Sequence, residues 1–161
     1  MQTLEDFKAF LKAIRSETGL DAMVADETGL VSLRVDDTYN VYLQFIEASG
    51  KILCFVEIVD LPRDTPKDVY RSLLTGALFG EKTAGGYFTL EETNETVLYN
   101  YLFDGDVMTK DPDEFIQTLE QILQLCNMWE ERIRDELSTT SANSTDSSDP
   151  LPFYNYTMLH M

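Results

Sequence analysis

Residues 31–59 read VSLRVDDTYNVYLQFIEASGKILCFVEIV, and this stretch decides the fold. Apolar side chains alternate with polar ones from 31 to 35 and again from 39 to 45. Alternation with a period of two is typical of strands that bury one face. The run at 52–59 is apolar at nearly every position, which predicts a central strand covered on both faces. Short turns join the three runs, so they predict an antiparallel meander.

Helical periods lie on both sides of the meander. Residues 3–17 carry apolar side chains at steps of three and four, which predicts an amphipathic helix. Residues 22–25 are predicted to add a short strand before the meander. After it, Thr65 is the predicted N-cap and Pro66 the first residue of a helix that runs to about residue 79. The apolar arc of that helix is wide enough to contact two partners.

Two more strands and a last helix complete the pattern. Gly85 and Gly86 open a predicted strand at 87–90, and a second strand follows at 96–103. The last helix begins at the predicted N-cap Asp111 and keeps its apolar period for almost its whole length. The order α-β-β-β-α-β-β-α predicts an α+β fold, in which a twisted antiparallel sheet of about five strands carries three helices.

The chain divides into three predicted parts. The α+β domain covers residues 1–137. Residues 138–149 are Ser, Thr, Asn and Asp with one Ala, a composition typical of a flexible linker. Residues 150–161 form an apolar C-terminal tail that contains Leu, Phe, Tyr and Met.

The charge of the chain limits its partners. The sequence contains 29 acidic and 12 basic residues, for a net charge of −17 and a pI of about 4.2. Such a surface repels nucleic-acid phosphates and anionic lipids, so neither nucleic acid nor membrane insertion is expected. The N-terminal residues lack the pattern of a secretory signal, and no apolar stretch is long enough to span a bilayer. These features predict a cytoplasmic protein, and they favour buried free thiols at Cys54 and Cys126, although a disulfide between them stays open.

Groups for catalysis are scarce. The single histidine is His160, so the predicted domain has no imidazole for general-base work. Neither cysteine has an activating neighbour in the sequence, and the chain has no phosphate-binding glycine motif. Asp104, Asp106 and Asp111 lack the spacing of a calcium loop. We therefore expect no enzymatic activity, metal or cofactor; a hydrolase that uses carboxylates alone is a distant alternative.

One region resembles a known family. An apolar helix reads YRSLLTGALFG at 70–80, TAGG follows at 83–86, and a later strand ends in Leu-Phe-Asp at 102–104. This arrangement resembles the class I chaperones of bacterial type III secretion systems. The resemblance is closest over 69–104, extends more loosely over 1–136, and leaves out the tail.

The resemblance implies a homodimer in the bacterial cytoplasm that binds the N-terminal segments of secreted effectors and keeps them soluble and competent for secretion. A secretion ATPase is a further candidate partner. By the same resemblance, the effector-binding residues are Phe7, Phe10, Leu11, Ile14, Val31, Leu33, Val35 and Tyr42. The implied dimer interface contains Tyr70, Leu73, Leu74, Ala77, Leu78, Val97, Tyr99 and Tyr101.

Each of these assignments has an alternative. The implied groove residues could equally form an ordinary core. Burial of Phe10 together with Phe7 favours the core, and partial exposure of Phe10 favours a groove. A regulatory adaptor that binds a folded partner is the alternative function. The segment at 151–161 is hypothesised to occupy a client groove of its own or the other subunit, so its deletion would raise client affinity; docking on its own core and a cloning remnant are the alternatives.

Overall fold

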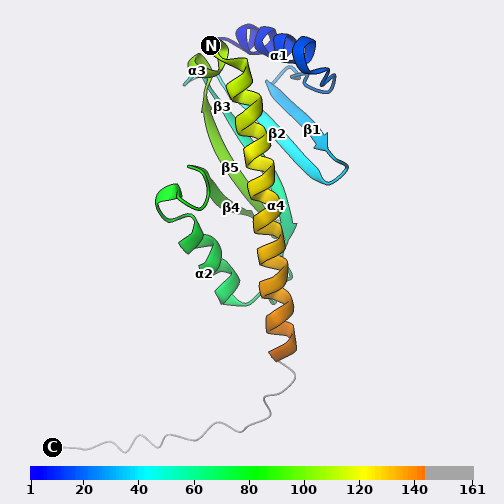
Figure 1. Cartoon of the computed structure of the whole chain (residues 1–161), viewed down its shortest axis with the longest axis vertical. Helices are drawn as coiled ribbons and strands as arrows, with labels where there is room; N and C mark the ends of the chain where they lie inside the picture. Colours follow the sequence, from blue (N-terminus) through cyan, green and yellow to red (C-terminus); the bar gives the residue numbers. More distant parts are fainter. Residues whose placement is uncertain (144–161) are drawn as a thin grey trace, which may run out of the picture.

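The computed structural model describes residues 1–143, with side chains to residue 139. A single antiparallel sheet has the strand order β1-β2-β3-β5-β4, and its helices cover one face (Figure 1). The predicted α+β class is therefore confirmed. The elements are α1 (Leu4–Thr18), β1 (Leu30–Val35), β2 (Tyr39–Ile46), β3 (Lys51–Asp60), α2 (Lys67–Gly76), the 3-10 turn η1 (Leu78–Gly80), β4 (Tyr87–Glu91), β5 (Thr96–Asp104), α3 (Gly105–Lys110) and α4 (Pro112–Asn143).

The predicted meander is present as β1, β2 and β3. Val31 pairs with Leu43 and Leu43 with Cys54, so the buried side chains of the three strands share one face. β3 lies at the centre of the sheet, as predicted. The prediction that both of its faces are covered is wrong, because alternate β3 side chains are only half-buried. The strand predicted at 22–25 is also absent, and that segment is a turn and an irregular loop.

The core lies between the sheet and two helices, α1 and α4. The Phe7 ring of α1 stacks on Phe45 of β2, with 5.3 Å between ring centroids. The Phe10 ring meets the edge of Phe115 at the start of α4, at 5.2 Å. Helix α1 therefore covers one end of the sheet and also packs on α4.

Helix α4 runs along the whole sheet (Figure 1). Asp111 accepts a hydrogen bond from the backbone of Glu114, as the predicted N-cap should. Apolar side chains at steps of three and four face the sheet, where Cys126, Trp129 and Ile133 are almost completely buried. The helix continues to Asn143, so its last residues fall in the range predicted as a linker.

Helix α2 is shorter than the sequence predicts. It begins at Lys67 and ends at Gly76, and the chain then turns through η1. Phe79 has a φ of 59°, in the left-handed region that non-glycine residues seldom adopt. That backbone reverses the chain and directs the Phe79 side chain outward, where it is 88% exposed.

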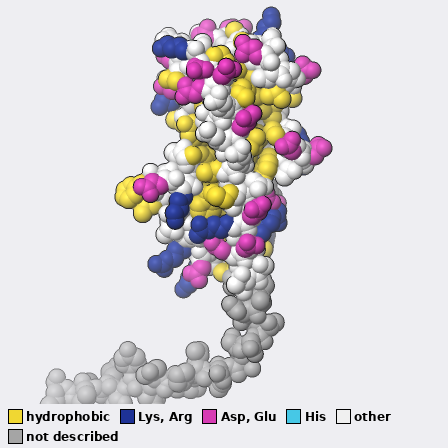
Figure 2. Space-filling model, viewed as in Figure 1, with side chains coloured by type: hydrophobic (Ala, Val, Ile, Leu, Met, Phe, Trp, Pro, Cys, Tyr) yellow, Lys and Arg dark blue, Asp and Glu magenta, His cyan; other side chains and the backbone are white. Residues whose placement is uncertain are grey.

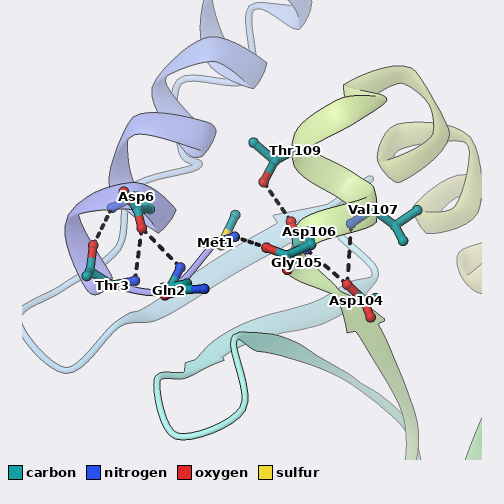
Figure 3. A network of polar contacts seen from close by, with 9 residues as sticks. All are labelled: Met1, Gln2, Thr3, Asp6, Asp104, Gly105, Asp106, Val107 and Thr109. Atoms are coloured by element: carbon teal, nitrogen blue, oxygen red, sulfur yellow. Dashed lines mark hydrogen bonds and ion pairs between the residues drawn. The ribbon is translucent and has the colours of Figure 1, made fainter.

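A polar network fixes the beginning of α1 next to the end of β5 (Figure 3). Thr3 and Asp6 form a capping box at the first turn of α1. The amino group of Met1 forms an ion pair with Asp106. Asp104 accepts hydrogen bonds from the first turn of α3, a short helix that the sequence did not predict. These contacts hold α1 and α3 against the same end of the sheet.

Candidate binding surfaces

The implied effector-binding residues of α1 are part of the core. Phe7 and Ile14 are 0% exposed, Leu11 is 1% exposed and Phe10 is 5% exposed. Phe10 and Phe7 are thus buried together, which favours an ordinary core over a client groove at these positions. Two of the implied strand residues, Val31 and Leu33, are buried on the same side of the sheet. These six side chains hold α1 on the sheet, and contact between them and a client stays a prediction.

Tyr42 lies on the opposite face of the sheet from those residues. Its ring stacks on Phe55 at 4.8 Å, and its hydroxyl donates to Glu57 at 3.1 Å. Partial burial, followed by the hydrogen bond to Glu57, raises the pKa of Tyr42. The structure thus separates Tyr42 from the other seven residues. Of those seven, Val35 is the one that remains partly accessible.

The face that carries Tyr42 is open and partly apolar. The strand registers place Tyr42, Phe55 and Leu53 of neighbouring strands on it, with Leu98 and Leu102 of β5. All five side chains are at least partly accessible to solvent. A sheet with one covered and one open face normally has polar residues outside, so apolar side chains here indicate a contact surface.

A second apolar surface lies on the outer side of α2. We call it the outer α2 surface, and it consists of Tyr70, Leu74, Leu78 and Phe79. Leu74 is 75% exposed and Leu78 is 60% exposed, whereas Val69 and Leu73 of the same helix are buried. The wide apolar arc seen in the sequence thus divides into an inner and an outer face. Isolated exposed leucines are common, but adjacent large apolar side chains are typical of interaction sites.

The outer α2 surface is positioned by packing beneath it. Trp129 of α4 lies against Gly76, where a Cβ atom would come within 2.1 Å of the indole. The indole nitrogen donates to the carbonyl of Lys82 at 3.0 Å, and Phe88 meets the ring edge-on at 4.8 Å. One side chain therefore holds α2, the loop after η1 and β4 together.

The Gly85-Gly86 junction is held by β5. The Tyr99 hydroxyl donates to the carbonyl of Thr83 at 2.7 Å, and the Thr83 hydroxyl donates to the carbonyl of Gly86 at 2.6 Å. A Cβ atom on Gly86 would come within 2.3 Å of the Tyr99 hydroxyl. Burial raises the pKa of Tyr99, so the phenol stays a proton donor. The junction therefore requires glycine next to a buried tyrosine.

The implied dimer residues divide in the same way. Leu74 and Leu78 are exposed, and Tyr70, Ala77 and Tyr101 are half-buried. Leu73, Val97 and Tyr99 are core residues. Sequence reasoning did not select Phe79, Tyr87 or Leu90, although all three are exposed. The Phe-Gly pair at 79–80, in the turn η1 that follows α2, was a signal that could have identified Phe79.

A polar cavity of about 410 Å³ lies between α4 and the turn that joins β1 to β2. The Tyr39 hydroxyl reaches into it and forms hydrogen bonds with Asn127 at 3.1 Å and Glu130 at 3.0 Å. Burial, with the hydrogen bond to Glu130, raises the pKa of Tyr39 to about 12. Arg134 forms an ion pair with the same Glu130, so these groups satisfy one another and anchor α4.

The described residues offer little for catalysis. Cys54 and Cys126 are free and 0% exposed, and burial raises the pKa of Cys126 to about 12. Such thiols are poor nucleophiles. Within residues 1–143 no group of three or more His, Cys, Asp and Glu side chains could hold a metal ion. None of the described helices is long and apolar enough to cross a membrane. His160 and the predicted tail at 150–161 lie outside the described residues.

Comparison with known protein families gives one match that covers most of the chain. The family model of the Tir chaperone protein (CesT) family matches residues 9–130. This range contains both apolar surfaces described above. No curated protein sequence gives a significant match.

Solved structures share the fold at low sequence identity. A chain in the crystal structure of the ExsC-ExsE complex superposes with a TM-score of 0.69 at 19% identity, covering 81% of this chain and 96% of that one. A chain of the HopA1-SchA chaperone-effector complex superposes with a TM-score of 0.61 at 19% identity, covering 82% of this chain and 95% of that one. A chain in the crystal structure of the Yersinia pestis type III secretion chaperone SycH in complex with a stable fragment of YscM2 superposes with a TM-score of 0.54 at 15% identity, covering 74% of this chain and 98% of that one.

Proposed function

The chain belongs to the Tir chaperone protein (CesT) family, and we propose that it is a non-enzymatic cytoplasmic chaperone for effectors of a bacterial type III secretion system. In this proposal it binds the N-terminal segment of an effector and keeps that segment soluble and ready for export. The observation that carries the proposal is the family match combined with large apolar side chains left on two surfaces. A disordered client can cover such surfaces over a long path, because it orders as it binds.

We propose that the client approaches the β1 edge of the sheet. β1 is the first strand in the sheet order, so its outer edge can pair with an added strand. Val35 and Tyr42, the accessible members of the implied effector-binding set, lie at this end of the sheet on opposite faces. The buried members, such as Phe7 and Leu33, would act by holding α1 and β1 in place.

We propose that a second copy of the chain covers the outer α2 surface. Leu74 and Leu78 face solvent next to Phe79, so an isolated chain leaves these three side chains uncovered. Obligate homodimer interfaces are rich in such residues. The core residues Val97 and Tyr99 would support the interface from behind, because β5 packs under Trp129 and the Gly85-Gly86 junction.

The test is co-expression with effectors from the same genome, followed by light scattering to measure the mass of the purified complex. We expect two copies of the chain with one effector N-terminal segment. The Leu74→Asp/Leu78→Asp variant should give a monomer, because it places charges on the outer α2 surface. The Val35→Asp/Tyr42→Asp variant should keep the dimer and lose the client.

Asn94→Asp is the matched control. It adds one negative charge in the exposed β4–β5 turn and should bind client as the unchanged protein does. A folded partner in place of a disordered segment would favour the regulatory adaptor. A stable monomer that binds no effector would refute the proposal.

A further inference from the structure

The outer α2 surface borders a groove with a mixed lining. Tyr70, Leu74 and Leu78 supply its apolar part, and Lys67 and Arg71 supply positive charge; the volume is about 580 Å³. Asp68 also lines the groove, so the two cations outnumber the anion. This composition fits a ligand that carries acidic and apolar groups together.

Positive charge at this place is unusual for the molecule. The whole chain has a net charge of −17, yet three cations lie close together in the sequence here: Arg63 in the turn before α2, and Lys67 and Arg71 in its first two turns. None of the three forms an ion pair with another residue that the structure describes. Figure 2 shows dark blue side chains beside yellow ones in the lower part of the molecule, where α2 and the end of α4 lie.

The end of α4 lies next to the start of α2. Gly76 meets Trp129, and Ser72 donates to Glu136 at 2.8 Å, so the two helices run in opposite directions. Thr139 borders a second groove, whose other wall contains Asp68 and Arg71 of α2. From the described end of α4, the outer α2 surface therefore presents Lys67 and Arg71 first, and Leu74 and Leu78 farther along α2.

The sequence after α4 has its acidic and apolar residues in that same order. Asp146 and Asp149 come first, and Leu151, Phe153, Tyr154, Tyr156, Met158 and Leu159 follow. Seven residues, 144–150, lie between α4 and Leu151. A chain of that length spans roughly 15 Å as a coil, which is about the length of the ten-residue helix α2.

We infer that residues 144–161 dock on the outer α2 surface of their own chain. Asp146 and Asp149 lie near Lys67 and Arg71, and the apolar residues after them cover Leu74 and Leu78. The proposed function assigns this surface to a second copy of the chain, so a docked segment competes with dimer formation. This competition, but not the docking, rests on the proposed function. The docking itself is independent of any client.

The direct test uses the full-length protein with Tyr154→Cys carrying a nitroxide spin label. Cys54 and Cys126 are fully buried, so the label attaches to the new cysteine alone under native conditions. Paramagnetic broadening of backbone amide signals then reports which surface the segment contacts. We expect Leu74 and Leu78 to lose more than half of their signal, while Ser32 and Arg34 of β1 keep theirs.

Charge reversal supplies the matched control. Lys67→Glu/Arg71→Glu should abolish the broadening, and Asp146→Lys/Asp149→Lys in the same chain should restore it. Equal signals at Leu74 and Ser32 would overturn the inference. A mixing experiment supplies a second such outcome: chains that carry the spin label but no NMR isotope are mixed with chains that carry the isotope but no spin label. Broadening that appears only in this mixture would also overturn the inference, because the contact would then be between two copies.

The consequence for dimerisation is measured separately by analytical ultracentrifugation. Phe153→Ser/Tyr156→Ser removes apolar groups from the segment and leaves residues 1–143 unchanged. If the segment occupies the surface about 90% of the time, about a tenth of each protomer is free to dimerise, and a dimer needs two free protomers. This variant should therefore lower the dimer dissociation constant about a hundredfold. An unchanged constant would overturn the competition. Broadening at α2 in a protein that binds no effector would support the docking while the proposed function failed.

Discussion

At the scale of single residues, the contact between Gly76 and Trp129 determines how closely α2 approaches α4. Glycine inside a helix costs about 1 kcal/mol relative to alanine, so an exposed Gly→Ala change normally stabilises. Here the Cβ would lie 2.1 Å from the ring, and the indole is held by Lys82, by Phe88 and by the Arg132 guanidinium at 4.9 Å. The ring cannot move aside without breaking these contacts.

We therefore predict that Gly76→Ala destabilises the protein by about 1–3 kcal/mol, the usual cost of overpacking. The measurement is urea unfolding at a fixed protein concentration, followed by the fluorescence of Trp129, the single tryptophan of the chain. Thr75→Ala, at the neighbouring exposed position, is the control and should change stability little. A Gly76→Ala variant as stable as the unchanged protein would contradict the contact.

Residue roles could be predicted only in part. The sequence identifies apolar residues such as Phe10 and Leu74 equally well, yet one is buried and the other is exposed. Which side of an element faces the core depends on the elements that pack against it. Those are distant in the sequence: Phe10 meets Phe115, and Gly76 meets Trp129. For the same reason the implied client residues could not be separated from core residues without the structure.

At the scale of elements, α1 depends on its first turn. The Thr3 side chain accepts a hydrogen bond from the backbone of Asp6 at 3.1 Å, and Asp6 accepts one from the backbone of Thr3 at 3.0 Å. Thr3→Ala removes half of this capping box, and we predict a loss of about 1 kcal/mol in the free energy of unfolding.

Urea unfolding monitored by circular dichroism checks this prediction. Ser16→Ala serves as the control, because Ser16 lies on the exposed side of the same helix and its loss should cost nothing. Equal stability of the Thr3→Ala and Ser16→Ala variants would show that α1 is held by its apolar face alone.

Elements with a clear period were predictable, and irregular ones were not. Apolar residues with a period of two predicted the strands of the meander, and apolar residues at steps of three and four predicted α1 and α4. The end of α2 was placed too late, because Leu78 and Phe79 continue the apolar pattern while the backbone has already turned at Gly76. Helix α3 has six residues, too few for a period to appear.

At the scale of the whole molecule, the two cysteines report on the integrity of the core. Cys54 is on β3 and Cys126 is on α4, and both are 0% exposed. We predict that both thiols react with an aromatic disulfide reagent at least about a hundredfold more slowly in the native protein than in urea, because reaction requires the helix and sheet to separate.

Ser32→Cys, on the exposed side of β1, is the control and should react at the rate of the unfolded chain. The two native thiols should react together, in one kinetic phase. Fast reaction of one of them would show that α4 opens locally. A mass lower by two hydrogens before labelling would show a disulfide instead of the two free thiols.

The late place of α4 in the chain has a consequence for synthesis. The apolar face of the sheet is completed by residues up to 104, but Cys126, Trp129 and Ile133 cover it from α4. During translation, the strands can pair while that apolar face is still exposed to solvent. Contacts between parts so distant in sequence also form slowly. Until α4 has emerged, the nascent chain therefore exposes apolar side chains of the sheet to solvent, and such partly folded species are prone to aggregate.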